Sequence, residues 1–154
     1  MTAGNASGIN DGACAMFIAS KDAAVAQGLT PRAKILGFAS AGVEPDIMGV
    51  GPIYSTRKLL DRLKLTMADF DVIEFSEAFA SQVIASTRVL GVDPFDDRIN
   101  PHGGGIALGH PLGMTGARLS MTAAHAMEAT DGRLALITMC VGVGQGVSIV
   151  IERV

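Results

Sequence analysis

The sequence predicts an α/β fold in which a mixed, mostly parallel sheet is flanked by helices. Short apolar runs alternate with amphipathic stretches along the 154 residues, which indicates strands alternating with helices. The run Arg133–Val141 is almost entirely apolar, as expected of a strand that is covered on both faces. Only the glycine-rich segment Gly142–Gly146 joins it to the last apolar run, Val147–Val154, so these two strands should pair antiparallel.

The first third of the chain is predicted to contain a loop, two strands and a short helix. Residues Thr2–Gly12 are rich in Gly, Asn, Ser and Asp, which favours a loop. The apolar run Ala13–Ser20 is bounded by turn-forming residues and predicts a buried strand, although a run of this length also allows a helix. A short helix is expected over Asp22–Gln27, and a strand over Ala33–Ala41.

The rest of the chain is predicted to alternate between helix and strand. The clearest helix is Tyr54–Leu63, because Leu59, Leu60 and Leu63 share one face and charged residues occupy the other. The other expected elements are a loop over Gly42–Pro52, a strand over Asp71–Phe75, a helix over Glu77–Leu90, a turn over Gly91–Asp97, a brief strand at Ile99 and a helix over Thr115–Ala129.

Composition excludes several classes of function. The net charge of −3 gives no basic surface for nucleic acid, and the absence of Trp argues against base stacking. No apolar run reaches the roughly 20 residues that a membrane-spanning helix needs. The two cysteines, Cys14 and Cys140, have no paired spacing, which argues against a disulfide framework or a metal site. We therefore expect a protein of a reducing compartment, the cytoplasm.

A glycine-rich segment, Gly103–Arg118, presents one histidine on a turn. His110 lies between Gly109, which allows close backbone approach, and Pro111, which keeps His110 out of helical geometry. Histidine is the side chain best suited to proton transfer near neutral pH. Taken alone, the motif also fits an incidental histidine before a helix.

A second glycine-rich turn follows the apolar run that ends near Cys140. Its spacing is Gly-x-Gly-x-Gly and it leads into a strand, so it lacks the helix N-terminus of a nucleotide-binding loop. A buried structural cysteine is one interpretation. The other is a site at a strand end, where glycine N–H groups form an oxyanion hole. Together with His110, the second interpretation predicts acyl-transfer chemistry, with the two reactive groups within one or two hydrogen-bond lengths.

Five blocks along essentially the whole chain resemble, in order, the C-terminal part of the thiolase family. The blocks are Gly4-Asn5-Ala6-Ser7-Gly8, Met48-Gly49-Val50-Gly51-Pro52, Ser76-Glu77-Ala78-Phe79-Ala80, Gly109-His110-Pro111 and Cys140-x-Gly142. The resemblance implies that residues 1–30 end the family's N-terminal half, including its strand at Ala13–Ser20, and that residues 31–154 form the C-terminal domain. The nucleophilic cysteine belongs to the N-terminal half, and Cys14 does not match its motif.

The resemblance also implies roles for four residues in catalysis. His110 matches the histidine that deprotonates the nucleophile and helps to form an oxyanion hole. Cys140 matches the second cysteine, which moves a proton at the substrate α-carbon, and Gly142 matches the N–H donor of the second oxyanion hole. Ser76 stands where the family usually has an asparagine that holds a water of the first oxyanion hole.

Three further residues are implied at the substrate. Ser7 matches a serine beside the pantetheine arm, Met48 matches a residue that lines the acyl pocket, and Phe79 belongs to the same matched block as Ser76. Coenzyme A is then a substrate, and no tightly bound cofactor or metal is implied. The expected partners are acyl-CoA and either the N-terminal thiolase half or another copy of the chain, with no nucleic acid or membrane.

The chain departs from the family pattern at several positions. His102 replaces a frequent asparagine before the glycines, and Val143 replaces a frequent glycine. The ending Cys-Val-Gly-Val-Gly-Gln-Gly is similar to that of β-ketoadipyl-CoA-type thiolases, which is a hint about the substrate. His125 lies on a predicted helix and is expected to be a packing or surface residue.

Two classes of function follow. In the first, the chain is the part of a thiolase that supplies the histidine base and the second cysteine and is inactive alone. In the second, it is a non-catalytic thiolase-like fragment that acts as a folding or association module. Coding sequence immediately upstream for a thiolase N-terminal half would decide between them.

Overall fold

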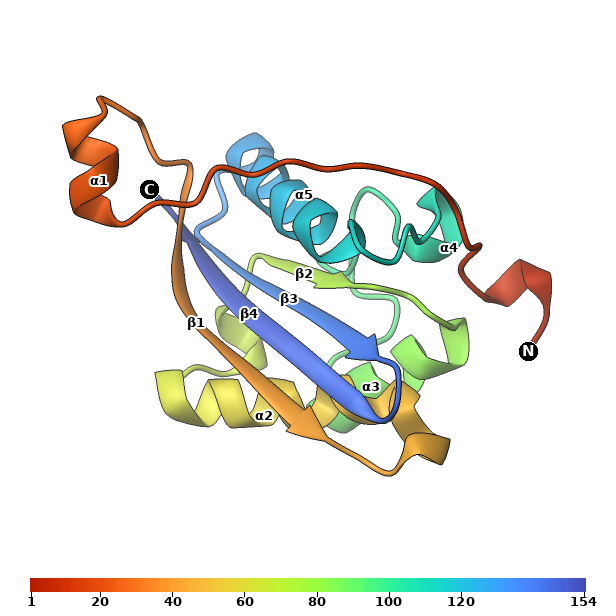
Figure 1. Ribbon diagram of the computed structural model, residues 1–154. Coiled ribbons are helices and arrows are strands. Elements are labelled where there is room, and N and C mark those ends of the chain that lie inside the picture. The colour runs from red at the N-terminus through yellow and green to blue at the C-terminus, as the bar shows by residue number, and fades with distance from the viewer.

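A four-stranded sheet in the order β1–β4–β3–β2 forms the centre of the computed structural model, which describes residues 1–154 (Figure 1). The strands are β1 (Ala33–Gly42), β2 (Val72–Phe75), β3 (Leu134–Val141) and β4 (Gln145–Arg153). The expected α/β fold with a mixed sheet and a C-terminal antiparallel pair is confirmed. The sheet is not mostly parallel, however, because β4 lies between β1 and β3 and runs antiparallel to both, which leaves β2–β3 as the parallel pair.

Helices cover both faces of this sheet (Figure 1). On one face, α2 (Gly51–Leu63) and α3 (Ala80–Leu90) close a core that contains Leu59, Phe75 and Leu136. On the other face, α5 (Thr115–Thr130) packs on the sheet through its apolar stripe, and the four residues of that stripe are fully buried: Leu119, Ala123, Ala126 and Met127. No helix is both long enough and apolar enough to cross a bilayer.

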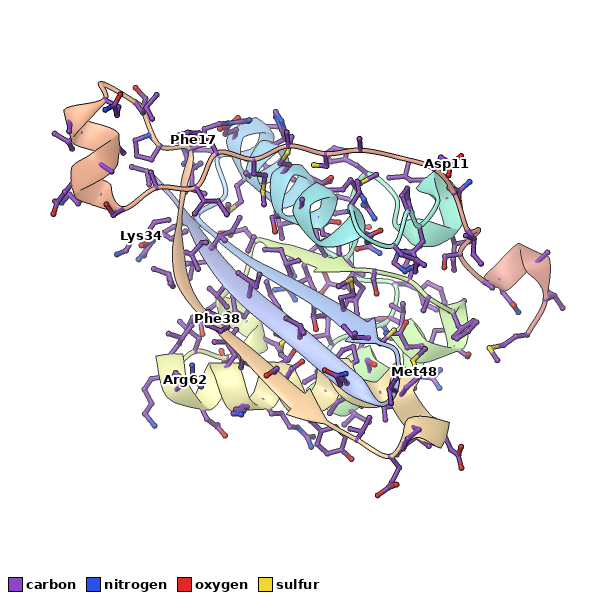
Figure 2. All side chains as sticks on the ribbon, viewed as in Figure 1. Asp11, Phe17, Lys34, Phe38, Met48 and Arg62 are labelled. Atoms are coloured by element: carbon purple, nitrogen blue, oxygen red, sulfur yellow. The ribbon has the colours of Figure 1, made fainter.

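The exposed edge of β1 is protected by two basic side chains of α2. Lys58 donates to the Ser40 carbonyl at 3.1 Å and Arg62 donates to the Phe38 carbonyl at 3.0 Å. Figure 2 labels Arg62 and Phe38 on these neighbouring elements. Backbone carbonyls that accept from lysine and arginine are not free to pair with another strand, so this edge is shielded from association.

The loop predicted over Gly42–Pro52 is partly helical. The 3₁₀ segment η2 (Pro45–Val50) occupies its centre, and α2 begins at Gly51, three residues before the predicted start. A Cβ atom on Gly51 would lie 2.5 Å from the Gln145 carbonyl oxygen, so only glycine lets the helix start pack on the backbone of β4. Pro52 supports this start, because its fixed φ suits the first turn of a helix.

The third predicted helix begins later than expected, at Ala80 instead of Glu77. Glu77 adopts a left-handed backbone conformation with φ of 56°, which no helical turn accommodates. Ile99 makes the brief strand contact that the sequence predicts, a parallel bridge to Ile73. The remaining short elements are η1 (Ala3–Asn5), α1 (Lys21–Ala26), η3 (Met67–Asp69) and α4 (Gly105–Leu108).

The prediction of a buried strand over Ala13–Ser20 is wrong. The segment is extended but forms no strand, and residues 13–19 make no backbone–backbone hydrogen bond. It runs beside α5 (Figure 1), and the Cys14 thiol lies 3.2 Å from the Met121 sulfur. Figure 2 labels Phe17 on this segment. The surface of Phe17 is 80% exposed. An apolar run becomes a buried strand only when another strand lies beside it, and none does here.

An apolar cavity of about 490 Å³ separates this segment from the face of the sheet on which α5 packs. Met16 and Ile18 line one side, and Met121 and Ile149 line the other. The cavity and the exposed side chains of the segment together form an apolar surface of the kind that drives association.

We therefore expect the 154-residue chain to self-associate instead of persisting as a compact monomer. Light scattering at micromolar concentration should give a mass above the 15.8 kDa of one chain. Replacing Phe17 and Ile18 together by serine should move the mass toward that of the monomer, because the apolar segment then loses its two most exposed large side chains. Phe95→Ser, in an exposed loop elsewhere, is the control. A stable wild-type monomer that binds no hydrophobic dye would contradict this prediction.

Candidate active site

The parallel pair β2–β3 brings Ser76 and Cys140 to the same edge of the sheet. Phe75 pairs with Thr138 in the ladder, and the Ser76 N–H donates to the Thr138 carbonyl at 3.2 Å. Cys140 follows two residues later, at the end of β3, with 8% of its surface exposed. Burial raises the pKa of the Cys140 thiol, and the nearby Ser76 hydroxyl partly opposes this rise. The thiol is therefore protonated near neutral pH.

The N-terminal segment 6–9 connects two of the predicted motifs. Ala6 bridges Phe79, and the Ser7 N–H donates to the Ala78 carbonyl at 3.1 Å. One residue later, the Gly8 carbonyl accepts from the His110 N–H at 3.0 Å. This short extended segment therefore places Ser7 beside Phe79 and connects both to the backbone of His110.

The glycines before His110 are required by close packing against the end of β2. A Cβ atom on Gly105 would lie 2.4 Å from the Ser76 carbonyl oxygen and 3.3 Å from the Ser7 Cβ. A Cβ atom on Gly104 would lie 2.1 Å from the Glu77 Cδ. Because no side chain fits at either position, the histidine loop sits directly on the backbone that carries Ser76.

The imidazole of His110 is held by the first residue of α5. His110 Nδ1 lies 2.7 Å from Thr115 Oγ1, and that hydroxyl donates to the Pro111 carbonyl at 2.9 Å. A hydroxyl has one proton, so Thr115 must accept from Nδ1–H. The geometry therefore assigns the Nδ1–H tautomer to His110 and leaves Nε2 with a free lone pair, the arrangement of a general base.

A pair of ionisable residues lies between β2 and α5. Arg118 Nη1 lies 3.9 Å from Glu74 Oε2, and the Glu74 side chain is fully buried. Burial raises the pKa of Glu74 to about 8, although Arg118 opposes the rise. The pKa of His110 is lowered, first by burial and then by the positive charge of Arg118. Both effects on His110 favour the neutral imidazole.

The turn after Cys140 offers an unpaired donor and contains a strained residue. Gly142 is exposed, and its N–H makes no hydrogen bond within the chain. Val143 has φ of 66°, a conformation that costs a non-glycine residue about 1–2 kcal/mol. Gly144 also has positive φ, and a Cβ atom there would lie 2.2 Å from the Val43 carbonyl oxygen. The turn is therefore fixed against the chain beyond β1, with the Gly142 N–H free.

Comparison with known proteins identifies the family. The family model described as thiolase, C-terminal domain, matches residues 29–153. This chain belongs to the thiolase C-terminal domain family.

Several full-length thiolases match over the whole chain. The β-ketoadipyl-CoA thiolase of Pseudomonas aeruginosa is 61% identical over 154 residues, which are 100% of this chain and 38% of that protein. The 3-oxoadipyl-CoA/3-oxo-5,6-dehydrosuberyl-CoA thiolase of Escherichia coli is 56% identical over the same shares. The crystal structure of the Bacillus anthracis acetyl-CoA acetyltransferase superimposes with a TM-score of 0.92 at 39% identity, covering 99% of this chain and 38% of that chain. The chain thus spans 38% of the length of these relatives.

Met48 and His125, two further residues considered from the sequence, lie on η2 and α5. Met48 is half-buried on η2, which packs against β3 and β4 (Figure 2). His125 is exposed on α5 and bonds to Arg32, so it is a surface residue as expected. The distance between the reactive atoms of His110 and Cys140 stays a prediction.

Sequence reasoning missed several polar residues that support the site. Thr115 holds the ring of His110. Glu74 and Arg118 form a pair beneath His110. Glu77 and Asn100 hold the loop that carries His110. One signal was available in the sequence, because Glu74 interrupts an otherwise apolar strand. The other residues act through partners distant in the chain, which residue patterns do not reveal.

Replacing Arg118 by methionine should raise the pKa of His110. The positive charge of Arg118 lowers that pKa, so its loss favours the protonated ring, while the part caused by burial remains. An NMR titration of the three histidines of the chain measures the shift directly. Arg133→Met, which removes an exposed arginine paired with Glu152, is the matched control. An unchanged His110 titration in Arg118→Met would refute this coupling.

Glu74 should make the chain less stable as the pH rises. Its pKa is about 8 in the folded chain and near 4.5 in the unfolded chain, so between these values the folded state holds a proton that the unfolded state releases. Raising the pH from about 5 to 8 then favours unfolding, whereas the lowered pKa of His110 acts in the opposite direction below about 6.5. Urea unfolding measures the free energy of unfolding across this range. As the pH rises, this free energy should fall further for wild type than for Glu74→Gln. The exposed Glu44→Gln should track wild type, and parallel curves for wild type and Glu74→Gln would count against the prediction.

Proposed function

We propose that this chain supplies the histidine base and the second cysteine of a thiolase-type acyltransferase, and that it is inactive alone. The observation that carries the proposal is the hydrogen bond between His110 Nδ1 and Thr115, which leaves Nε2 as a free base on a loop packed against Ser76. The reaction is acyl transfer between 3-ketoacyl-CoA or acetyl-CoA and CoA, by thiolytic cleavage or by Claisen condensation.

The protonation states support complementary roles for the two groups. A neutral His110 accepts the proton of a nucleophilic thiol, whose thiolate attacks the 3-keto carbonyl of the substrate. Cleavage of the carbon–carbon bond leaves its electron pair on the α-carbon of acetyl-CoA. The Cys140 thiol, kept protonated by burial, gives its proton to that carbon, and in condensation the same group removes it. The free N–H of Gly142 suits an oxygen that becomes negative.

The substrate assignment rests on the neighbours of these groups and on the relatives. Ser7 and Phe79 border the His110 loop and suit contact with the pantetheine arm, while Met48 suits the acyl pocket. The names of the Pseudomonas aeruginosa and Escherichia coli thiolases point to β-ketoadipyl-CoA, also called 3-oxoadipyl-CoA, as the preferred acyl-CoA. Coenzyme A enters as a substrate, with no tightly bound cofactor.

The nucleophile is proposed to come from a preceding thiolase half. The Cys14 thiol faces the Met121 sulfur on α5, at 3.2 Å, and belongs to the apolar segment beside the cavity. Residues 1–30 are then the end of that preceding half, and residues 31–154 are the C-terminal domain. The two parts would work together in the cytoplasm.

A second candidate function is favoured by the apolar segment. The cavity of about 490 Å³ and the exposed Phe17 suit a chain that associates with another copy or with a thiolase half without taking part in catalysis. In that case His110 and Cys140 would be remnants of a site. Activity measurements separate the two candidates.

The isolated chain should show no thiolysis of acetoacetyl-CoA or of 3-oxoadipyl-CoA, because no acyl-enzyme forms without the nucleophile. Mixing it with the first 62% of the Pseudomonas aeruginosa thiolase, the complement of the 38% matched here, should restore activity. In that mixture His110→Ala should abolish turnover and His125→Ala should leave it unchanged. Turnover by the chain alone would overturn the proposal, and failure of a formed complex to turn over would favour the association module.

In the same mixture, Ser76→Asn should leave the rate unchanged or raise it. An asparagine at this position restores the amide that the family uses to hold a water in the first oxyanion hole. A large loss of rate would mean that Ser76 is adapted to another role, such as lowering the pKa of the Cys140 thiol.

A further inference from the structure

Glu77 and Asn100 form a polar bridge between the end of β2 and the loop that carries His110. Asn100 Nδ2 donates to Glu77 Oε1 at 2.5 Å, and the Ile106 N–H donates to Glu77 Oε2 at 3.1 Å. The Asn100 side-chain oxygen accepts from the Phe75 N–H at 2.7 Å. Each oxygen of the Glu77 carboxylate and both ends of the Asn100 amide therefore have a partner.

The backbone around this bridge is strained in a way that the bridge explains. Glu77 and Asn100 both have left-handed conformations, with φ of 56° and 44°. An asparagine tolerates this conformation, but it is costly for a glutamate, so surrounding contacts must stabilise it at Glu77. The three hydrogen bonds supply those contacts, and Gly104, where a Cβ atom would meet the Glu77 Cδ, leaves room for them.

The bridge acts on His110 through the short helix α4. Glu77 fixes Ile106 in the first turn of α4, and that helix ends with the Gly109 N–H bonded to the Gly105 carbonyl at 2.9 Å. His110 follows directly, with its own N–H on Gly8 and its ring on Thr115. Glu77 therefore holds the side of the loop before His110, where neither Gly8 nor Thr115 reaches.

We propose that Glu77 and Asn100 are positioning residues for His110, which hold its imidazole in the Nδ1–H tautomer on Thr115. The proposal rests on the proposed role of His110 as a base, since only a fixed tautomer keeps Nε2 free. It does not require Glu77 to touch a substrate. The carboxylate is needed because two N–H donors converge on it, from Asn100 and from Ile106.

This chemistry allows a swap that separates positioning from charge. In Glu77→Gln, the amide nitrogen of the glutamine faces an N–H donor, so one hydrogen bond is lost. Adding Asn100→Asp restores all three bonds, because the glutamine then donates to the aspartate and accepts from Ile106, while the aspartate accepts from Phe75. The double variant also keeps the net charge of wild type.

The test uses the 154-residue chain labelled with ¹⁵N-histidine, in which two-bond nitrogen–proton NMR spectra report the tautomer of His110 without any activity. Wild type should show well-separated Nδ1–H and Nε2 resonances. In Glu77→Gln the two should move toward each other, as the ring samples both tautomers, and in Glu77→Gln/Asn100→Asp they should return to the wild-type positions. Leu60→Ala, which weakens the core on α2, should lower stability and leave the His110 resonances unchanged.

The proposal is overturned if Glu77→Gln keeps the wild-type resonances, or if the double variant folds but does not recover them. If Glu77→Gln does not fold, the double variant decides alone, since recovery of both the fold and the resonances is expected and failure to recover contradicts the proposal. A complemented thiolase mixture that shows no turnover would remove the proposed function and leave this NMR result unaffected.

Discussion

The candidate site depends on one close contact at the end of β2, where Gly105 packs on the Ser76 carbonyl and Gly104 packs on the Glu77 side chain. A Cβ atom at either glycine would lie less than 2.5 Å from an atom of Ser76 or Glu77, so nothing larger than hydrogen separates the two segments. This contact joins the loop that carries His110 to the end of β2, which lies beside the strand β3 that carries the Cys140 thiol. Because Gly105 packs directly on the Ser76 carbonyl, steric contact between the two backbones sets the separation of the segments at this point.

Beneath this contact, the layer between β2 and α5 contains the pair of ionisable residues Glu74 and Arg118. Glu74 lies two residues after Val72 and therefore on the same face of β2. Because Val72 packs against the α5 stripe, the Glu74 carboxyl points toward the helix that follows His110. A buried ion pair is a weak source of stability, because desolvation of both groups offsets their attraction. Burial raises the pKa of Glu74 to about 8, so Glu74 is mostly protonated near neutral pH and compensates little of the charge of Arg118. That charge, together with burial, lowers the pKa of His110 and favours the neutral imidazole.

The sequence predicted those features that repeat along the chain or occur within a few residues. The shared face of Leu59, Leu60 and Leu63 predicted the helix α2, and the short glycine turn predicted the antiparallel β3–β4 pair. The segment 13–20 was predicted wrongly because hydrophobicity indicates a need for burial but not the presence of a partner strand. Motifs singled out His110, Cys140 and Ser76 as candidate site residues, whereas they gave no role to Thr115, Glu77 or Asn100. Their roles arise from contacts between segments, and the left-handed backbone of Glu77 has no signature in residue type.

The boundary of the matched domain is not the boundary of the site. The family model begins at residue 29, yet the His110 N–H donates to Gly8 and the Phe79 backbone bridges Ala6. A shortened chain that began at the domain boundary would retain the sheet, both helical layers and the Glu77–Asn100 bridge. It would lose the extended segment whose Gly8 carbonyl accepts from the His110 N–H. The position of the imidazole therefore depends on three separate anchors, and one of them lies upstream of the domain that carries the histidine.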